Sequence, residues 1–422
     1  MMRQIQPNEW RIRWCHAVAH PVLSACLSPP LPNSETESRQ YSDRCSQRHH
    51  RAHPSTPNAN NVMIDTIKSA SRESFRYPPG LSPRSAYVRA AMLCGFEEVI
   101  GAAGGDAKLL ATRVGIPPRA MNDPDMAISW TTVGALMELA SKELGSPAFG
   151  LEWLGAAREP LISFGAIALI ARFTSTVGEW CHHSRNYWQW HTNASHAELI
   201  EPVGRNSLIF RVHFSDVVPV SRHQVEYLLG GVCSLMATLT SATLEGIKVV
   251  RFQHPRPANT DLHLAAFPCP VEFGCAFNEL VYDRNLHDHR IDVPSTAVDG
   301  WLRHYVKART WTIPDYDGTT RANVEIAIPS LIGTSFCTQP HIAKLLSLSP
   351  KTLQRQLAKE NVRFSELLDK ARQRMARQFL AESEIPVASV AGLLGYAKTP
   401  PFTAAVHRWT GWSPRQFRDR SK

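Results

Sequence analysis

The chain has 422 residues, 43% of them hydrophobic and 20% charged, which is a normal mixture for two or three globular domains. Its longest apolar run, residues 161–173, is too short to cross a bilayer, so no membrane partner is expected. The formal net charge is +9. Residues 341–422 alone carry 15 Lys and Arg against 6 Asp and Glu, so residues 1–340 balance to zero and a basic module follows a neutral one.

Nine cysteines are scattered along the chain without a CxxC pair or a compact set of ligands. This pattern favours reduced, mostly buried thiols in a cytoplasmic protein, and it predicts neither a metal site nor a cofactor. The first thirty residues do not form a convincing signal peptide, because histidines and a proline interrupt their apolar stretch.

Residues 1–78 differ from the rest of the chain. Pro, Ser, Asn, Arg and His dominate residues 28–61, and no apolar period is present. Such a segment buries too little apolar surface to offset the entropy lost on ordering. We therefore predict a disordered extension over 1–78.

Residues 83–294 show a helical period that later changes to the period of strands. Apolar spacing predicts helices over 87–99, 107–114, 129–144, 161–173, 176–191 and 225–244. Alternation predicts strands over 207–214, 248–254, 271–273 and 280–282. Helices first and strands afterwards indicate an α+β domain. Residues 295–330 are predicted to be a linker with one helix around 301–307.

Residues 331–422 are predicted to be all-α, with two helix-turn-helix units. The first unit comprises helices at 341–346 and 350–361, and a connecting helix over 364–381 leads to the second, at 387–394 and 399–409. Ser349 followed by Pro350 is a strong helix start, and Ser413 with Pro414 starts a terminal helix.

The charge excess and the side chains of the second helix favour double-stranded DNA as the partner. Leu353 and Leu357 lie on one side of this helix, so its polar residues are left to the surface. Gln and Arg pair with base edges, and basic groups bind phosphates. Two units on a rigid helix would address major-groove faces about 34 Å apart. The alternative is a helical bundle with a solvated basic face. The candidate DNA contacts of the first unit are Lys351, Thr352, Gln354, Arg355 and Lys359.

The module resembles the C-terminal DNA-binding domain of the AraC/XylS family of transcription regulators. The resemblance is carried by SPKTLQR, LLDKARQRMARQFL, VASVAGLLGY and PFTAAVHRWTGWSPRQFR. It implies that Lys351, Thr352, Gln354 and Arg355 match the first base-reading helix. It also implies a nucleoid-associated homodimer in the cytoplasm that engages RNA polymerase, with activation as the more usual outcome.

The second unit departs from the family pattern. Pro400 and Pro401 precede Phe402, Ala404 stands where an arginine is common, and Val406 stands where a core phenylalanine is usual. These changes remove hydrogen-bonding side chains from the surface that normally faces bases. We predict that this unit mainly grips the DNA backbone, with the first unit carrying most specificity. Its candidate DNA contacts are Thr399, Thr403, His407 and Arg408.

Residues 83–294 resemble the arabinose-binding-like effector domain found in one branch of this family. The resemblance rests on FGAIALIARFTSTVGEW, VVRFQHPRP and CPVEFGCAFNELVYDR, and it implies a small-molecule sensor without identifying the ligand. An aromatic and histidine cluster supplies candidate effector contacts, although ordinary core packing explains the same residues. A metal at Cys181–His183 is disfavoured, because adjacent residues point to different helix faces. The candidates are Trp180, His183, Tyr187, Trp188 and His191.

An enzyme is not expected. The sequence has no GxSxG, P-loop or HExxH motif, and no GxGxxG after a strand; the one acid/base-like cluster is His287–His289. The sequence therefore predicts a DNA-binding transcription regulator whose N-terminal domain senses a small molecule. The alternative is a constitutive or nonspecific DNA-binding protein without an effector, which competition with random DNA would distinguish.

Overall fold

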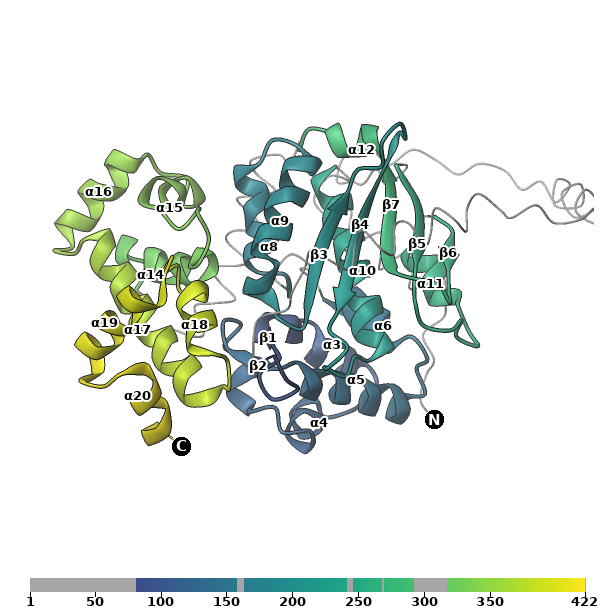
Figure 1. Ribbon diagram of the computed structural model, residues 1–422, viewed down its shortest axis with the longest axis horizontal. Coiled ribbons are helices and arrows are strands. Elements are labelled where there is room, and N and C mark those ends of the chain that lie inside the picture. The colour runs from purple at the N-terminus through teal and green to yellow at the C-terminus, as the bar shows by residue number, and fades with distance from the viewer. Residues whose placement is uncertain (1–80, 158–162, 241–245, 268, 292–316, 422) are drawn as a thin grey trace, which may run out of the picture. The chain divides into compact units, whose positions relative to one another are not determined.

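The computed structural model describes residues 81–157, 163–240, 246–267, 269–291 and 317–421 (Figure 1). The extension predicted over 1–78 and the helix predicted around 301–307 lie outside these ranges. The described residues form an α+β part up to residue 291 and an all-helical part from residue 317, as the sequence predicts.

A five-stranded sheet organises the α+β part, with strand order β3-β4-β7-β5-β6 (Figure 1). All neighbours are antiparallel except β5 and β6. The alternation in 207–214 is confirmed as β4, and β7 is longer than predicted. Strand β3 was not predicted from the sequence. The strand bounds are β3 Ser195–Ile200, β4 Ser207–Phe214, β5 Ile247–Arg251, β6 Val271–Glu272 and β7 Asn278–Asp283.

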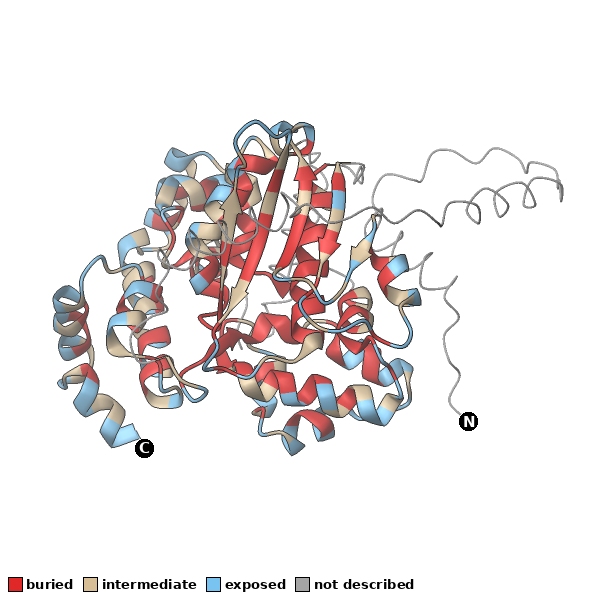
Figure 2. Ribbon diagram, turned by 45° about the vertical axis from the view of Figure 1, so that its right-hand side comes forward, coloured by how far each residue is buried: buried red, intermediate tan, exposed pale blue. Residues whose placement is uncertain are grey.

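One face of the sheet is apolar and packs on helices α9 (Val177–His191) and α10 (Arg222–Leu239). Phe210 and Leu280 face each other across β4 and β7, and both are fully buried. Helix α10 is buried along nearly its whole length, which explains its continuous apolar sequence. Figure 2 shows the buried residues concentrated in the sheet and the helices around it.

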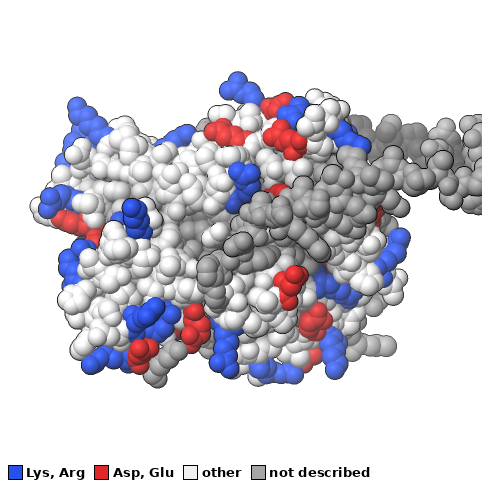
Figure 3. All heavy atoms as spheres, viewed as in Figure 1, with Lys and Arg blue, Asp and Glu red and all other residues white. Residues whose placement is uncertain are grey.

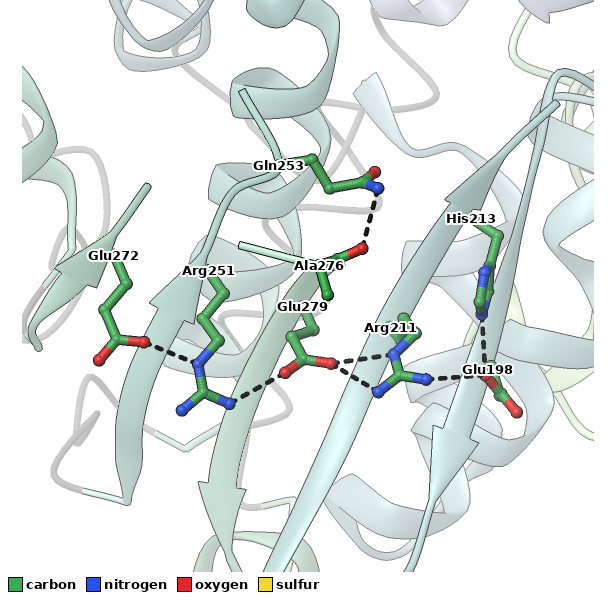
Figure 4. Close-up of polar contacts among 8 residues, drawn as sticks. All are labelled: Glu198, Arg211, His213, Arg251, Gln253, Glu272, Ala276 and Glu279. Carbon is green, nitrogen blue, oxygen red and sulfur yellow. Dashed lines mark hydrogen bonds and ion pairs between the residues drawn. The ribbon is translucent and has the colours of Figure 1, made fainter. Parts of the chain in front are cut away.

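The opposite face carries a ladder of alternating charges (Figure 4). Arg211 on β4 contacts Glu279 on β7 at 2.9 Å, and Glu279 contacts Arg251 on β5 at 3.0 Å. Arg251 continues to Glu272 on β6 at 2.8 Å, and Glu198 on β3 closes the other end near Arg211 at 3.8 Å. Each carboxylate stands opposite a guanidinium in the strand register, so the charges help to fix that register.

The first predicted helix, 87–99, is wrong. Tyr87–Arg89 form strand β1, which pairs with β2 (Ala127–Ser129), and a 3-10 turn (Ala90–Leu93) precedes α3 (Phe96–Ala102). The Tyr87 amide donates to the Asn193 side chain at 2.8 Å and its carbonyl accepts from Thr192 at 2.7 Å. These partners, more than a hundred residues away, satisfy the backbone in extended form, which local periodicity cannot indicate.

The remaining helices of this part surround the sheet and the β1–β2 pair. Helices α4, α5 and α9 begin within one residue of their predicted starts. The predicted helix 161–173 is a short α8 continued by a 3-10 turn, and α6, α11 and α12 were not predicted. The bounds are α4 Ala107–Arg113, α5 Trp130–Leu144, α6 Phe149–Ala156, α8 Ala166–Leu169, α11 Asp261–Ala266 and α12 Arg284–Asp288.

The all-helical part begins earlier than predicted. Thr320–Leu331 form helix α14 inside the range assigned to the linker, and α14 packs against α17. Its buried residues Val324, Ile328 and Leu331 explain this position, because they complete the core of the helical part. The other helices lie close to their predicted ranges: α15 Gln339–Leu345, α16 Pro350–Lys359, α17 Phe364–Glu382, α18 Val387–Leu393, α19 Thr399–Thr410 and α20 Pro414–Ser421.

Candidate nucleic-acid interface

Helix α16 presents the polar surface that the sequence predicts for the first unit. Its start is fixed by Ser349, whose hydroxyl accepts the Thr352 amide at 3.1 Å, with Pro350 at the first helical position. Leu353 and Leu357 are buried against the rest of the unit. The Thr352 hydroxyl is also held by Ser349, at 2.8 Å, so it is oriented by the cap.

The remaining predicted contacts of α16 are exposed and free to meet a partner. Lys351, Gln354, Arg355 and Lys359 are all exposed, and within the described part of the chain no hydrogen bond or ion pair engages them. Leaving four long polar side chains unpaired on one short helix costs nothing in water and provides donors for base edges and phosphates.

Helix α17 holds the second unit through arginines that donate to backbone carbonyls. Arg372 donates to the Leu394 carbonyl at 2.9 Å, where α18 ends, and Arg377 donates to the Trp409 carbonyl at 3.1 Å, near the end of α19. Arg418 on α20 similarly contacts the carbonyl of Leu380. These guanidiniums satisfy carbonyls that a helix end leaves without a partner. Part of the basic excess is therefore structural.

Helix α19 of the second unit exposes a different surface. Phe402, Ala405 and Val406 are buried, so the valine fills the core position. Thr399, Pro400, Thr403, Ala404 and His407 line a shallow surface hollow whose exposed area is almost wholly apolar. The structure thus brings the predicted contacts Thr399, Thr403 and His407 together on one side of the helix.

Arg408, the fourth predicted contact of the second unit, lies beside this hollow and is already paired. Its guanidinium contacts Asp369 on α17 at 2.7 Å, and the other carboxylate oxygen of Asp369 accepts from the Trp409 indole at 3.0 Å. Figure 3 shows Lys and Arg side chains along the margin where α16, α19 and α20 lie in Figure 1, with fewer acidic residues between them.

The candidate effector residues on α9 separate into two groups. Trp180, Trp188 and His191 are buried in the core, with the His191 ring stacked on Phe164 at 5.5 Å between centroids. Burial, followed by the charge of Arg89, lowers the pKa of His191 to about 3, so this imidazole is neutral.

His183 and Tyr187, the other two, lie on the opposite side of α9 against the loop that precedes α15. Their rings are parallel, 6.4 Å apart, and both contact Phe336. The Tyr187 phenol accepts the Ser335 amide at 3.0 Å and lies 2.7 Å from the Ser335 hydroxyl. Phe336 also contacts His341 in the first helix-turn-helix unit. This side of α9 therefore contacts the all-helical part directly.

A buried polar cluster that sequence reasoning missed lies at the start of α10. Glu226 is fully buried and contacts His263 at 2.9 Å, His254 at 3.5 Å and His223 at 3.6 Å. Burial opposes ionisation of Glu226, but the hydrogen bond with His263 and the nearby imidazole of His223 outweigh it and lower its pKa to about 2. The signal was available, since a Glu within an apolar helix needs a partner.

The described residues show neither a metal site nor a disulfide. Within those ranges, no group of three or more His, Cys, Asp or Glu is arranged to hold a metal ion, and the described cysteines are free thiols. No helix in the described ranges is long and apolar enough to cross a membrane.

Two known protein families match this chain, one in each of its two parts. Residues 104–291 match the model of the arabinose-binding domain of AraC transcription regulators, and residues 342–420 match a helix-turn-helix domain model. The chain belongs to the AraC family. It is a transcription regulator in which a ligand-sensing type of N-terminal domain is joined to a DNA-binding domain.

Two curated relatives share this AraC-family arrangement over most of their length. The regulator VirS of Mycobacterium tuberculosis is 25% identical over 78% of this chain and 96% of its own length. The ornithine utilization regulator of Pseudomonas aeruginosa is 23% identical over 72% of this chain and 88% of its own length. The crystal structure of the regulator CdpR from Pseudomonas aeruginosa aligns with 68% of this chain and 91% of its own, at 22% identity and a TM-score of 0.32.

Proposed function

We propose that this AraC-family protein reads its operator chiefly through α16. The observation that carries the proposal is a set of exposed side chains on that helix that no other described residue engages, namely Lys351, Gln354, Arg355 and Lys359. Gln354 and Arg355 would pair with base edges, because an amide and a guanidinium match adenine and guanine in the major groove. Lys351, Lys359 and the Thr352 hydroxyl would contact phosphates.

Single substitutions in α16 separate base reading from phosphate binding. An operator is first selected from random DNA with the full chain. Gln354→Ala and Arg355→Ala should each cost about 1–3 kcal/mol and relax specificity at one base pair. Lys351→Ala and Lys359→Ala should weaken binding to all sequences and reduce the salt slope by about 1 each. Gln373→Ala, the same change on α17, is the control and should leave affinity unchanged. Unaltered specificity in both Gln354→Ala and Arg355→Ala would remove α16 as the reading helix.

We also propose that the second unit grips the DNA backbone, with Thr399, Thr403, His407 and Arg408 nearest to it. What supports this is the position of α19, which repeats the position of α16 in the first unit, and the lack of amide or free guanidinium groups in its hollow. Methylation of single phosphates in the selected operator should interfere with binding over both half-sites, whereas single base-pair substitutions should weaken binding mainly over one.

We propose that effector binding to the N-terminal domain is transmitted through α9. The candidates Trp180, Trp188 and His191 form its core side, and His183 and Tyr187 form the side that contacts Phe336. A ligand that shifts the core side would therefore alter contacts next to the first unit. A thermal-shift screen of metabolites against the full chain, followed by tryptophan fluorescence of the hits, tests this. Hits that bind without altering operator affinity would argue against the coupling.

The assembly that we propose is a cytoplasmic, nucleoid-associated homodimer that activates transcription by engaging RNA polymerase. Family membership supports each of these steps. Sedimentation of the full chain with one operator measures the stoichiometry, and transcription in vitro with and without the protein measures activation. The competing function is a nonspecific DNA-binding protein without an effector. It predicts equal competition by random DNA, whereas a regulator should prefer its operator by several orders of magnitude at physiological salt.

A further inference from the structure

The hollow on α19 differs chemically from the reading surface of α16. Pro400, Ala404 and His407 are exposed, and the half-buried Thr399 and Thr403 complete the lining. The five described residues that line the hollow carry no side-chain amide, ammonium or guanidinium group, and their exposed area there is almost wholly apolar. Hydrogen-bonded recognition of a base edge by this surface is therefore restricted to threonine hydroxyls and one imidazole.

The start of α19 is equally unsuited to holding a phosphate. Helix N-termini bind anions through free backbone N–H groups in the first turn. Here the second and third residues of the helix are Pro400 and Pro401, which have no N–H group. Arg408, the guanidinium next to the hollow, is held by Asp369 at 2.7 Å. Apolar contact is therefore the main interaction left to Pro400, Ala404 and the threonine methyl groups, and the threonine hydroxyls and the His407 imidazole are the polar groups beside them.

The position of α19 indicates what this apolar surface meets. It is the second helix of a helix-turn-helix unit, like α16, and the matched helix-turn-helix domain spans both units. Exposed Lys398 precedes α19 and exposed Arg415 lies on α20, which follows it, and both favour a polyanion. Among the groups that double-stranded DNA displays in its major groove, the C5 methyl of thymine is the apolar one, and alanine and threonine methyl groups are side chains that contact it.

We propose that α19 recognises thymine by van der Waals contact of Thr403, Ala404 and Pro400 with thymine methyl groups. The second unit then adds sequence information without hydrogen bonds, alongside its grip on the backbone. This inference rests on the proposed DNA-reading function and deepens it. It assigns methyl recognition to α19 and hydrogen-bonded recognition to α16.

Replacement of thymine by deoxyuridine tests this directly, because it removes only the methyl group. An operator is selected with the full chain, and each thymine of both half-sites is replaced in turn while affinity is measured. We expect one or more replacements in the half-site bound by α19 to weaken binding about fourfold each, the factor for burying one methyl group. Thr403→Ser deletes the protein methyl and should reduce that penalty. The matched control, Thr352→Ser on α16, should leave it unchanged.

The outcomes separate this inference from the proposed function. Recovery of no operator overturns the regulator function itself. Recovery of an operator whose affinity is insensitive to every deoxyuridine replacement leaves that function intact and overturns methyl recognition. Should Ala404→Asp abolish activation in vitro while operator affinity stays unchanged, the surface contacts protein, and the inference is likewise overturned. Circular dichroism of Thr403→Ser confirms that the helix remains folded.

Discussion

The Arg408 guanidinium is 2.7 Å from Asp369, and this pair links the exposed flank of α19 to the connecting helix α17. The same carboxylate accepts the Trp409 indole at 3.0 Å, so Asp369 holds two consecutive residues of α19. At the proposed DNA interface, the Arg408 guanidinium would therefore be held in one orientation, with its charge partly neutralised by Asp369. An exposed pair of this kind contributes little to stability, so its main effect is on the charge available to phosphates.

Release of Arg408 should strengthen nonspecific DNA binding. Asp369→Asn keeps a hydrogen-bond acceptor for Trp409 while removing the charge that neutralises Arg408. We expect tighter binding to random DNA and a salt dependence steeper by about one unit, because one more phosphate is contacted. The control is Asp419→Asn on α20, which removes an equal charge without releasing Arg408. Equal salt dependence of DNA binding in the two variants would show that Asp369 does not keep Arg408 from contacting phosphates.

The charge ladder of the sheet predicts that replacing either of two glutamates by alanine lowers the free energy of unfolding by very different amounts. Glu279 is buried and neutralises both Arg211 and Arg251, so Glu279→Ala leaves the buried Arg211 without its main partner. We expect a loss of about 3–5 kcal/mol in the free energy of unfolding of the N-terminal domain. Glu272→Ala, at the exposed end of the ladder, should cost at most about 1 kcal/mol. Urea unfolding followed by tryptophan fluorescence measures both. Similar losses of unfolding free energy in the two variants would show that burial does not set the contribution of Glu279.

The stability of the N-terminal domain should fall as the pH drops below about 6.5. His191 has a pKa near 3 in the fold, against an ordinary value of 6.5, so between these values the unfolded chain binds a proton that the folded chain does not. Its contribution is complete above pH 6.5 and is lost progressively below it, by about 2 kcal/mol at pH 5. His196, with a pKa lowered to about 4, acts in the same direction.

His191→Phe isolates the part of this pH dependence of stability that His191 causes. The phenyl ring preserves stacking on Phe164 and removes the titrating group, so the decline in unfolding free energy between pH 7 and pH 5 should be smaller by about 2 kcal/mol. Thermal and urea unfolding at several pH values measure the decline. His182→Phe, an exposed change on the same helix, is the control and should retain the wild-type profile. A pH profile unchanged in His191→Phe would contradict the buried neutral state.

The sequence predicted those helices and strands whose signals lie within the element itself or directly beside it. Alternation in Ser207–Phe214 gave β4 with its bounds, and a serine cap before Pro350 located α16. Strand β1 was missed, because the partners of Tyr87 are Thr192 and Asn193, far along the chain. The exposure of the candidate DNA contacts on α16 followed from the helical period. The pairing of Arg408 did not, because Asp369 lies on another helix, 39 residues earlier.

The contact between Tyr187 and Ser335 predicts a local effect on the loop before α15. The Tyr187 phenol accepts the Ser335 amide, so Tyr187→Phe should accelerate hydrogen exchange of that amide while exchange within α9 stays unchanged. Removal of one partly exposed hydrogen bond should alter global unfolding by only about 1 kcal/mol. The matched control is Tyr227→Phe, whose phenol contacts the distant Met92 carbonyl. If the Ser335 amide exchanges equally fast in the wild type and in Tyr187→Phe, α9 is not coupled to the first unit through this bond.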